Sequence, residues 1–199
     1  MKNPIQLVIA IMMVAILTGC GAATGEIRKM SRSGRTDVFT EIASEGPAPA
    51  GYADVIIKAS LKTPLAGYYP FERQGYAPGK ALCSFLVNID GQAILWQVQG
   101  HQHQLPKYVD GKTSRDPEAG EGMKYVLEKK VRLAVGSYNV FFSLPDETYH
   151  STTNISVKDG GLYVLEFQPN YRYKTLPTRI PTFLKGVNKF EIMVKEVTV

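Results

Sequence analysis

The sequence lacks the features that define several common classes of small protein. Its 199 residues include only two cysteines, Cys20 and Cys83, which excludes a disulfide-stapled miniprotein and the C-x-x-C motifs of zinc and redox sites. Charge is also sparse: 21% of the residues are charged and 44% are hydrophobic, which excludes a disordered polyelectrolyte. Glycine and proline follow no regular period, so a collagen-like chain is excluded as well. One ordinary globular domain with a short additional segment remains.

Motifs for nucleophilic catalysis and for phosphate binding are missing too. The sequence contains no G-x-S-x-G elbow and no glycine-rich phosphate loop. Cys83 falls on the apolar face of its predicted strand, together with Phe85 and Val87, and a thiol in that position packs as a small hydrophobic group. We therefore expect a protein that is not an enzyme and that uses no cofactor.

The first twenty residues have the composition of an export signal. Lys2 is the only charged residue before position 20, and residues 7–17 form an unbroken apolar run. A run of this length matches a signal-peptide core and is too short to cross a bilayer as a helix. It leads into Leu-Thr-Gly-Cys at 17–20, which resembles the bacterial lipobox. This resemblance implies cleavage after residue 19 and a lipid-modified, palmitate-carrying Cys20; the alternative is a plain secretory signal with a chance cysteine.

The resemblance to bacterial lipoproteins also implies a location. No second long apolar segment follows, so the covalent lipid on Cys20 would be the only membrane anchor, and several acyl chains hold a protein far better than one. Gly21 stands where many lipoproteins retained at the inner membrane have aspartate. We therefore expect a protein of the cell envelope that contacts a membrane through its lipid, at the outer membrane in preference to the inner one.

The remaining chain divides at about residue 50. Residues 20–50 are rich in small residues and proline and predict a flexible tether; four basic residues within it could contact anionic headgroups or could simply be solvated. Residues 51–199 show hydrophobicity with a period of two and no helical stretch of ten residues or more. Seven or eight short strands in this part predict an all-β fold, an antiparallel β-sandwich, preceded by a signal peptide at 1–19 and the tether at 20–50.

Turn signals and one strand pattern make this expectation more specific. Asp90-Gly91 and Asp159-Gly160-Gly161 are typical of tight turns between strands. The Gly-x-Tyr-x-Val stretch at 136–140 and the strand pattern at 154–165 resemble PEGA-like and transthyretin-like sandwiches of the bacterial envelope. Such modules generally bind or display, so the resemblance implies a binding or structural role without catalysis.

A pair of histidines forms the basis of an alternative function. His101 and His103 lie two residues apart, a spacing that puts both imidazoles on one face of an extended segment and supplies half of a zinc or copper site. His150, beside Asp146 and Glu147, is the one remaining histidine that could complete it. The alternative is therefore a metal-binding, periplasm-facing protein, although two histidines on a polar loop are also common without a metal.

Three further segments are candidates for a surface role. Residues 99–123 alternate little and predict a mobile flap. The aromatic stretch 68–71 with Tyr76 could stack on sugar rings or pack at the sandwich end. Residues 167–190 contain five basic residues and no acidic one. A stripe of positive charges with interleaved tyrosines is typical of recognition surfaces. We therefore expect the binding residues there to be Tyr171, Arg172, Tyr173, Lys174 and Arg179.

The partner of this basic segment follows from its charge and from export. Nucleic acid is excluded for an exported protein, which leaves an anionic envelope glycan, a lipid headgroup or another envelope protein. The alternative is a solvated crossover whose aromatic residues cover a sandwich edge.

Overall fold

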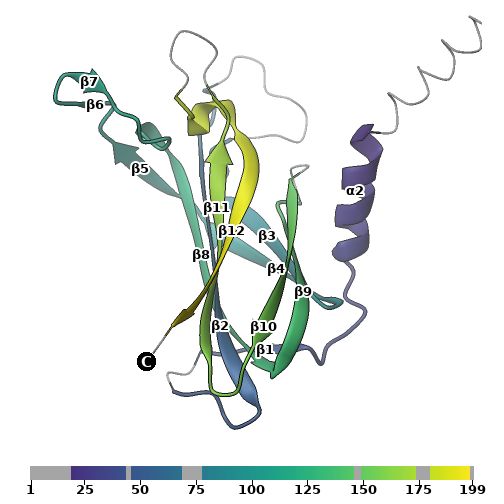
Figure 1. Ribbon diagram of the computed structural model, residues 1–199. Coiled ribbons are helices and arrows are strands. Elements are labelled where there is room, and N and C mark those ends of the chain that lie inside the picture. Colours follow the sequence, from purple (N-terminus) through teal and green to yellow (C-terminus); the bar gives the residue numbers. More distant parts are fainter. Residues whose placement is uncertain (1–18, 44–45, 69–77, 146–148, 174–179, 198–199) are drawn as a thin grey trace, which may run out of the picture.

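Two β-sheets face each other across a shared apolar core, and one α-helix lies against the outside of the smaller sheet (Figure 1). The computed structural model describes residues 19–43, 46–68, 78–145, 149–173 and 180–197, with side chains from residue 25 onward. The signal segment at 1–18 lies outside this range. The expected all-β, sandwich-like fold is confirmed.

The larger sheet has the strand order β1-β8-β2-β11-β12, and β5 pairs with β8 as well. Its members are β1 (Phe39–Glu41), β8 (Gly120–Ala134), β2 (Tyr52–Thr63), β11 (Leu162–Tyr171), β12 (Val187–Val197) and β5 (His101–Leu105). β2 and β11 run parallel, which departs from the antiparallel pattern that the sequence predicts. The reason is the turn after β10, which crosses from one sheet to the other and delivers β11 alongside β2 in the same direction.

The smaller sheet is antiparallel throughout, in the order β10-β9-β3-β4. It contains β10 (His150–Val157), β9 (Gly136–Ser143), β3 (Leu82–Ile89) and β4 (Gln92–Gln99). Asp90 and Gly91 connect β3 to β4 with φ angles of 44° and 93°, and a two-residue type I′ hairpin requires positive φ at both positions. The Asp-Gly turn signal is thus confirmed.

The core lies where the inward faces of the two sheets meet. Phe142 of the smaller sheet stacks on Phe167 of the larger one with ring centroids 4.1 Å apart, and Phe190 meets Phe142 edge-on at 4.9 Å. Val55 and Ile57 of β2 are fully buried there, as their alternation predicts. This core holds the two sheets together and thereby fixes the ends of the strands from which the loops emerge.

Cys83 provides a direct test of the strand register. The residue is half-buried and packs against the core on the same side of β3 as Phe85 and Val87. We expect a thiol reagent to label Cys83 slowly in the native chain and quickly after unfolding, because packing against the core restricts access of the reagent to the sulfur. Quenching the labelling reaction at set times and measuring the labelled fraction by mass spectrometry gives both rates. Equal rates in the two states would contradict the inward orientation of this side chain.

The segment expected to be a flexible tether instead carries structure. α2 (Gly19–Met30) is a helix of 12 residues within this segment. Ile27 and Met30 of α2 pack on Leu86 and Phe141, on the outer face of the smaller sheet. Two apolar residues are too few to produce a helical periodicity that the sequence alone would reveal. The helix is stabilised by its packing on the sheet.

The stretch expected to be a mobile flap contains several strands. Residues 99–123 form β5, then β6 (Tyr108–Val109) and β7 (Lys112–Thr113), and finally the start of β8. β6 and β7 form a small hairpin that extends from the body (Figure 1). The side chains of both strands are exposed. Because neither face of this hairpin is buried, its sequence shows no alternation of apolar and polar residues. We refer to residues 106–114 as the arm.

Candidate functional site

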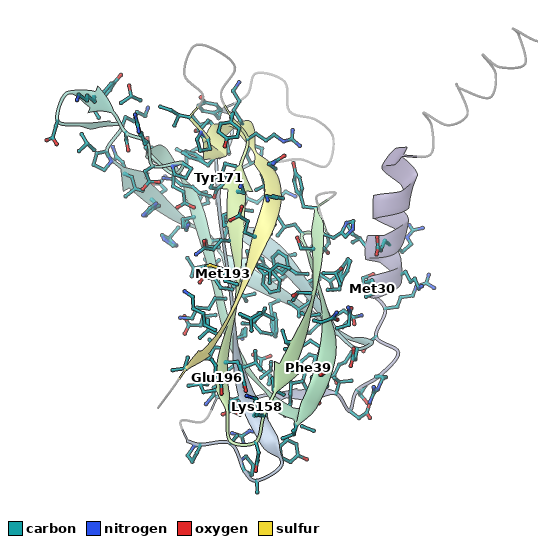
Figure 2. All side chains as sticks on the ribbon, in the orientation of Figure 1. Met30, Phe39, Lys158, Tyr171, Met193 and Glu196 are labelled. Atoms are coloured by element: carbon teal, nitrogen blue, oxygen red, sulfur yellow. The ribbon has the colours of Figure 1, made fainter. Side chains whose placement is uncertain are left out.

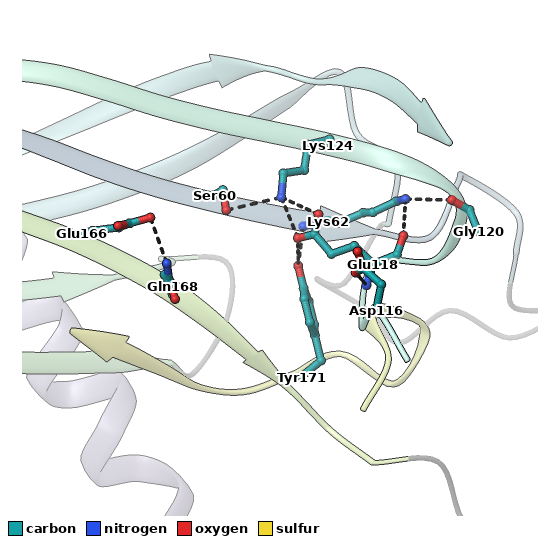
Figure 3. Close-up of polar contacts among 9 residues, drawn as sticks. All are labelled: Ser60, Lys62, Asp116, Glu118, Gly120, Lys124, Glu166, Gln168 and Tyr171. Carbon is teal, nitrogen blue, oxygen red and sulfur yellow. Dashed lines mark hydrogen bonds and ion pairs between the residues drawn. The ribbon is translucent and has the colours of Figure 1, made fainter. Parts of the chain in front are cut away.

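Four polar side chains that no sequence motif marks meet at one end of the larger sheet (Figure 3). They are Lys62 at the end of β2, Tyr171 at the end of β11, Lys124 near the start of β8, and Glu118 in the loop before β8. Lys62 is 1% exposed and Tyr171 is 2% exposed. We call these four residues the polar cluster. Because burying a polar group costs free energy unless it is hydrogen-bonded, the hydrogen-bond partners of the cluster decide what it does.

Lys62 is held by carbonyl oxygens rather than by a carboxylate. Its Nζ donates to the backbone carbonyls of Glu118 at 2.6 Å and Gly120 at 2.8 Å, and it lies 4.7 Å from the ring centroid of Phe183. Burial lowers the pKa of Lys62, while the nearby Glu118 carboxylate opposes that shift. Space around the ammonium is tight, because a Cβ added at Gly122 would come within 3.0 Å of Lys62 Cε. Lys62 thus ties the end of β2 to the loop before β8.

Tyr171 links β11 to both β2 and the loop before β8. Its hydroxyl accepts the backbone N–H of Lys62 at 2.8 Å and donates to Glu118 Oε1 at 2.9 Å. Both oxygens of Glu118 also accept from Lys124 Nζ, each at 2.6 Å. Burial, reinforced by the Glu118 charge, raises the pKa of Tyr171 far above its ordinary value, so this hydroxyl remains a donor at neutral pH. Tyr171 was expected on an exposed binding surface, and the structure contradicts this.

The other residues of the basic segment are only partly brought together. Arg172 is exposed; its Nη2 donates to the Tyr149 hydroxyl at 2.8 Å and its guanidinium lies 5.9 Å from the Tyr149 ring centroid. Tyr173 is 64% exposed and bridges to Pro181 through the backbone. Lys174 and Arg179 lie outside the described residues. Arg172 and Tyr173 therefore remain candidates for recognition.

The histidine pair lies on one strand, as its spacing indicates. His101 and His103 are both in β5, with ring centroids 6.2 Å apart. His150 does not join them: it belongs to the smaller sheet, where it stacks on Phe141 at 5.5 Å and its Nε2 lies 3.3 Å from Glu26 Oε2. Asp146 and Glu147 lie outside the described residues. Among the residues that the structure describes, no three His, Cys, Asp or Glu side chains gather in a way that could hold a metal ion.

Three exposed tyrosines belong to segments that leave the sandwich at the end that holds the polar cluster. Tyr173 follows β11, Tyr68 follows β2, and Tyr108 lies in the arm, which leaves the body where Leu105 of β5 pairs with Gly120. Their exposed fractions are 64%, 53% and 69%. Tyr69, Pro70, Phe71 and Tyr76 of the aromatic stretch lie outside the described residues. We call the end defined by Tyr68, Tyr108 and Tyr173 the tyrosine end.

Comparisons with protein-family models, with curated proteins and with solved structures found no match for this chain. Within the described ranges, no helix has the length and apolar character that crossing a membrane requires.

Proposed function

We propose that the protein is a non-enzymatic lipoprotein of the bacterial cell envelope, anchored through a lipid on Cys20, whose β-sandwich binds or supports an envelope polymer or protein partner. The observation that carries this proposal is the leader: one charge, an apolar run at 7–17 and then Leu-Thr-Gly-Cys at 17–20. The outer membrane is the preferred location, because Gly21 follows the cysteine.

The state of the buried polar groups supports a role without catalysis. Lys62 and Tyr171 are the most deeply buried groups with reactive potential in the polar cluster, and both are engaged by backbone or carboxylate partners. Neither faces an open space from which a substrate could approach. The cluster instead fixes the loops that present Arg172 and Tyr173, and this is what a binding module requires.

Replacing the lipidated cysteine tests the proposal. In a bacterial host fed with labelled palmitate, Cys20→Ser should abolish label incorporation and leave the protein uncleaved or free of the membrane fraction, because the thiol is the attachment atom. Cys83→Ser is the matched control and should incorporate palmitate like the unaltered chain. If the Cys20→Ser protein still incorporates label and stays with membranes after a high-salt wash, the protein is not a lipoprotein anchored at this residue.

A further inference from the structure

Helix α2 is attached along the outer face of β3 by contacts that give its direction. Near its carboxyl end, the Met30 carbonyl accepts from Asn88 Nδ2 at 2.7 Å. One turn earlier, Ile27 is buried against Leu86. As the helix is followed back toward Cys20, its contacts therefore move from residue 88 of β3 to residue 86, that is, toward the start of that strand.

The start of β3 lies toward the tyrosine end. Tyr125 pairs with Leu61 of β2, next to Lys62 of the polar cluster, and the Tyr125 hydroxyl donates at 2.7 Å to the carbonyl of Lys80, two residues before β3 begins. The amino end of α2 consequently points toward the tyrosine end. Figures 1 and 2 show the same arrangement: the helix rises from Met30 toward the level of Tyr171, whereas Lys158 lies at the opposite end.

The helix also fixes how far Cys20 can lie from the domain. Glu26 of α2 contacts His150 of the smaller sheet. Cys20 lies six residues before Glu26, which corresponds to about 9 Å along the helix. A flexible tether of about thirty residues could span about 100 Å and would allow the domain to turn freely. A docked helix instead holds the attachment point beside the domain, on the side of the tyrosine end.

The tyrosine end has the composition that a membrane surface favours. Tyr108 and Tyr173 present amphipathic rings, which prefer the interface between headgroups and water. Arg172 and Lys185 are exposed at the same end, within the stretch 167–190 that contains five basic residues and no acidic one. Basic residues close to an anionic leaflet are attracted to it, and the attraction is screened by salt.

We propose that the tyrosine end rests on the anionic headgroup surface of the same membrane that holds Cys20. The inference rests on the proposed lipid anchor, which sets the side from which the bilayer approaches. Rings of Tyr108 and Tyr173 enter the headgroup layer, Arg172 and Lys185 bind lipid phosphates, and the strands stand steeply on the membrane. The sandwich is thereby oriented with its opposite end, at Lys158, directed away from the bilayer.

Vesicle flotation of the mature chain carrying Cys20→Ser measures this surface without any contribution from acyl chains. We expect salt-sensitive flotation with phosphatidylcholine vesicles that contain phosphatidylglycerol, and none with phosphatidylcholine alone. The double change Arg172→Gln with Lys185→Gln should weaken binding about 30-fold, because each basic residue near an anionic leaflet contributes about 1 kcal/mol. Tyr108→Ser with Tyr173→Ser should weaken it severalfold.

The matched controls come from the opposite end of the molecule. Tyr52→Ser and Lys158→Gln remove an exposed tyrosine and an exposed lysine there and should leave flotation unchanged, with circular dichroism as the folding check for every variant. Absence of binding to the anionic vesicles, or equal losses in the control variants, would overturn the inference. Retention on peptidoglycan without vesicle binding would overturn it as well and assign the end to a polymer. Palmitate labelling is a separate measurement, so a failed anchor and a failed surface give different results.

Discussion

A chain that begins at residue 51 should have a free energy of unfolding about 5 kcal/mol below that of a chain that begins at residue 20. The segment removed contains Val38 and Phe39, which are 7% and 6% exposed and belong to the core between the sheets. Burying a side chain of this size contributes about 1.5–3 kcal/mol. A domain boundary at residue 51, which the composition suggested, therefore cuts through the core.

Polar contacts add to this loss. The Gln92 side chain accepts the N–H groups of Val38 and Phe39 at 2.7 and 3.1 Å and donates to the Phe39 carbonyl at 2.9 Å. Trp96 Nε1 donates to Glu41 Oε2 at 3.0 Å. Without residues 38–41, these partly buried groups lose partners that water replaces only in part.

Urea unfolding of three chains measures the effect. The chains begin at residues 20, 31 and 51, the first with serine at position 20; the second lacks α2 but keeps β1. The chain from 31 should lose much less stability than the chain from 51, because removing the helix uncovers the small cluster around Leu86 and Phe141 and removes the contacts to Asn88 and His150, but leaves β1 in the core. Equal stability of the chains from 20 and 51 would show that β1 contributes nothing to the domain.

The strands could be predicted because their signal is local. In β2 and β3, every second residue faces the core. Asp90 and Gly91 are residue types that tolerate the positive φ angles of their turn, so the turn can be predicted from these two residues alone. β1 and α2 have no comparable local signal. α2 contributes Ile27 and Met30, and β1 contributes Phe39 together with the preceding Val38. The surfaces that stabilise them, around Gln92 and on the outer face of β3, come from distant parts of the chain.

The polar cluster could not be predicted for the same reason, with one exception. Lys62, Glu118 and Tyr171 are more than fifty residues apart in sequence, and no spacing rule connects them. The inward orientation of the Tyr171 side chain could nevertheless be predicted from the sequence. Alternation along β11 places Leu165 and Phe167 inward, and continuing it for four residues places Tyr171 inward too. The composition of residues 167–190 alone assigned Tyr171 to the surface.

Replacing Glu118 with alanine should lower the free energy of unfolding by about 3 kcal/mol, the effect of removing one partner from a largely buried ion pair. The Lys124 and Glu118 side chains are 14% and 16% exposed, and their ion pair at 2.6 Å is shielded from water on most sides. Without the carboxylate, the Lys124 ammonium keeps only a long contact to Ser60 at 3.3 Å, and the Tyr171 hydroxyl loses its acceptor. The Lys62 ammonium also loses a nearby compensating charge.

Two further variants separate the charge from the shape of this side chain. Glu118→Gln keeps an oxygen that can accept from Tyr171 and Lys124, so its loss should be well below that of Glu118→Ala. Adding Lys124→Met to Glu118→Ala should recover part of the lost stability, because the unpaired ammonium is then removed and its volume is filled. Urea unfolding of the unaltered chain, Glu118→Ala, Lys124→Met and the double variant gives the coupling energy in a double-mutant cycle. Strictly additive losses, or an alanine variant as stable as the unaltered chain, would show that the polar cluster does not hold this end of the sandwich together.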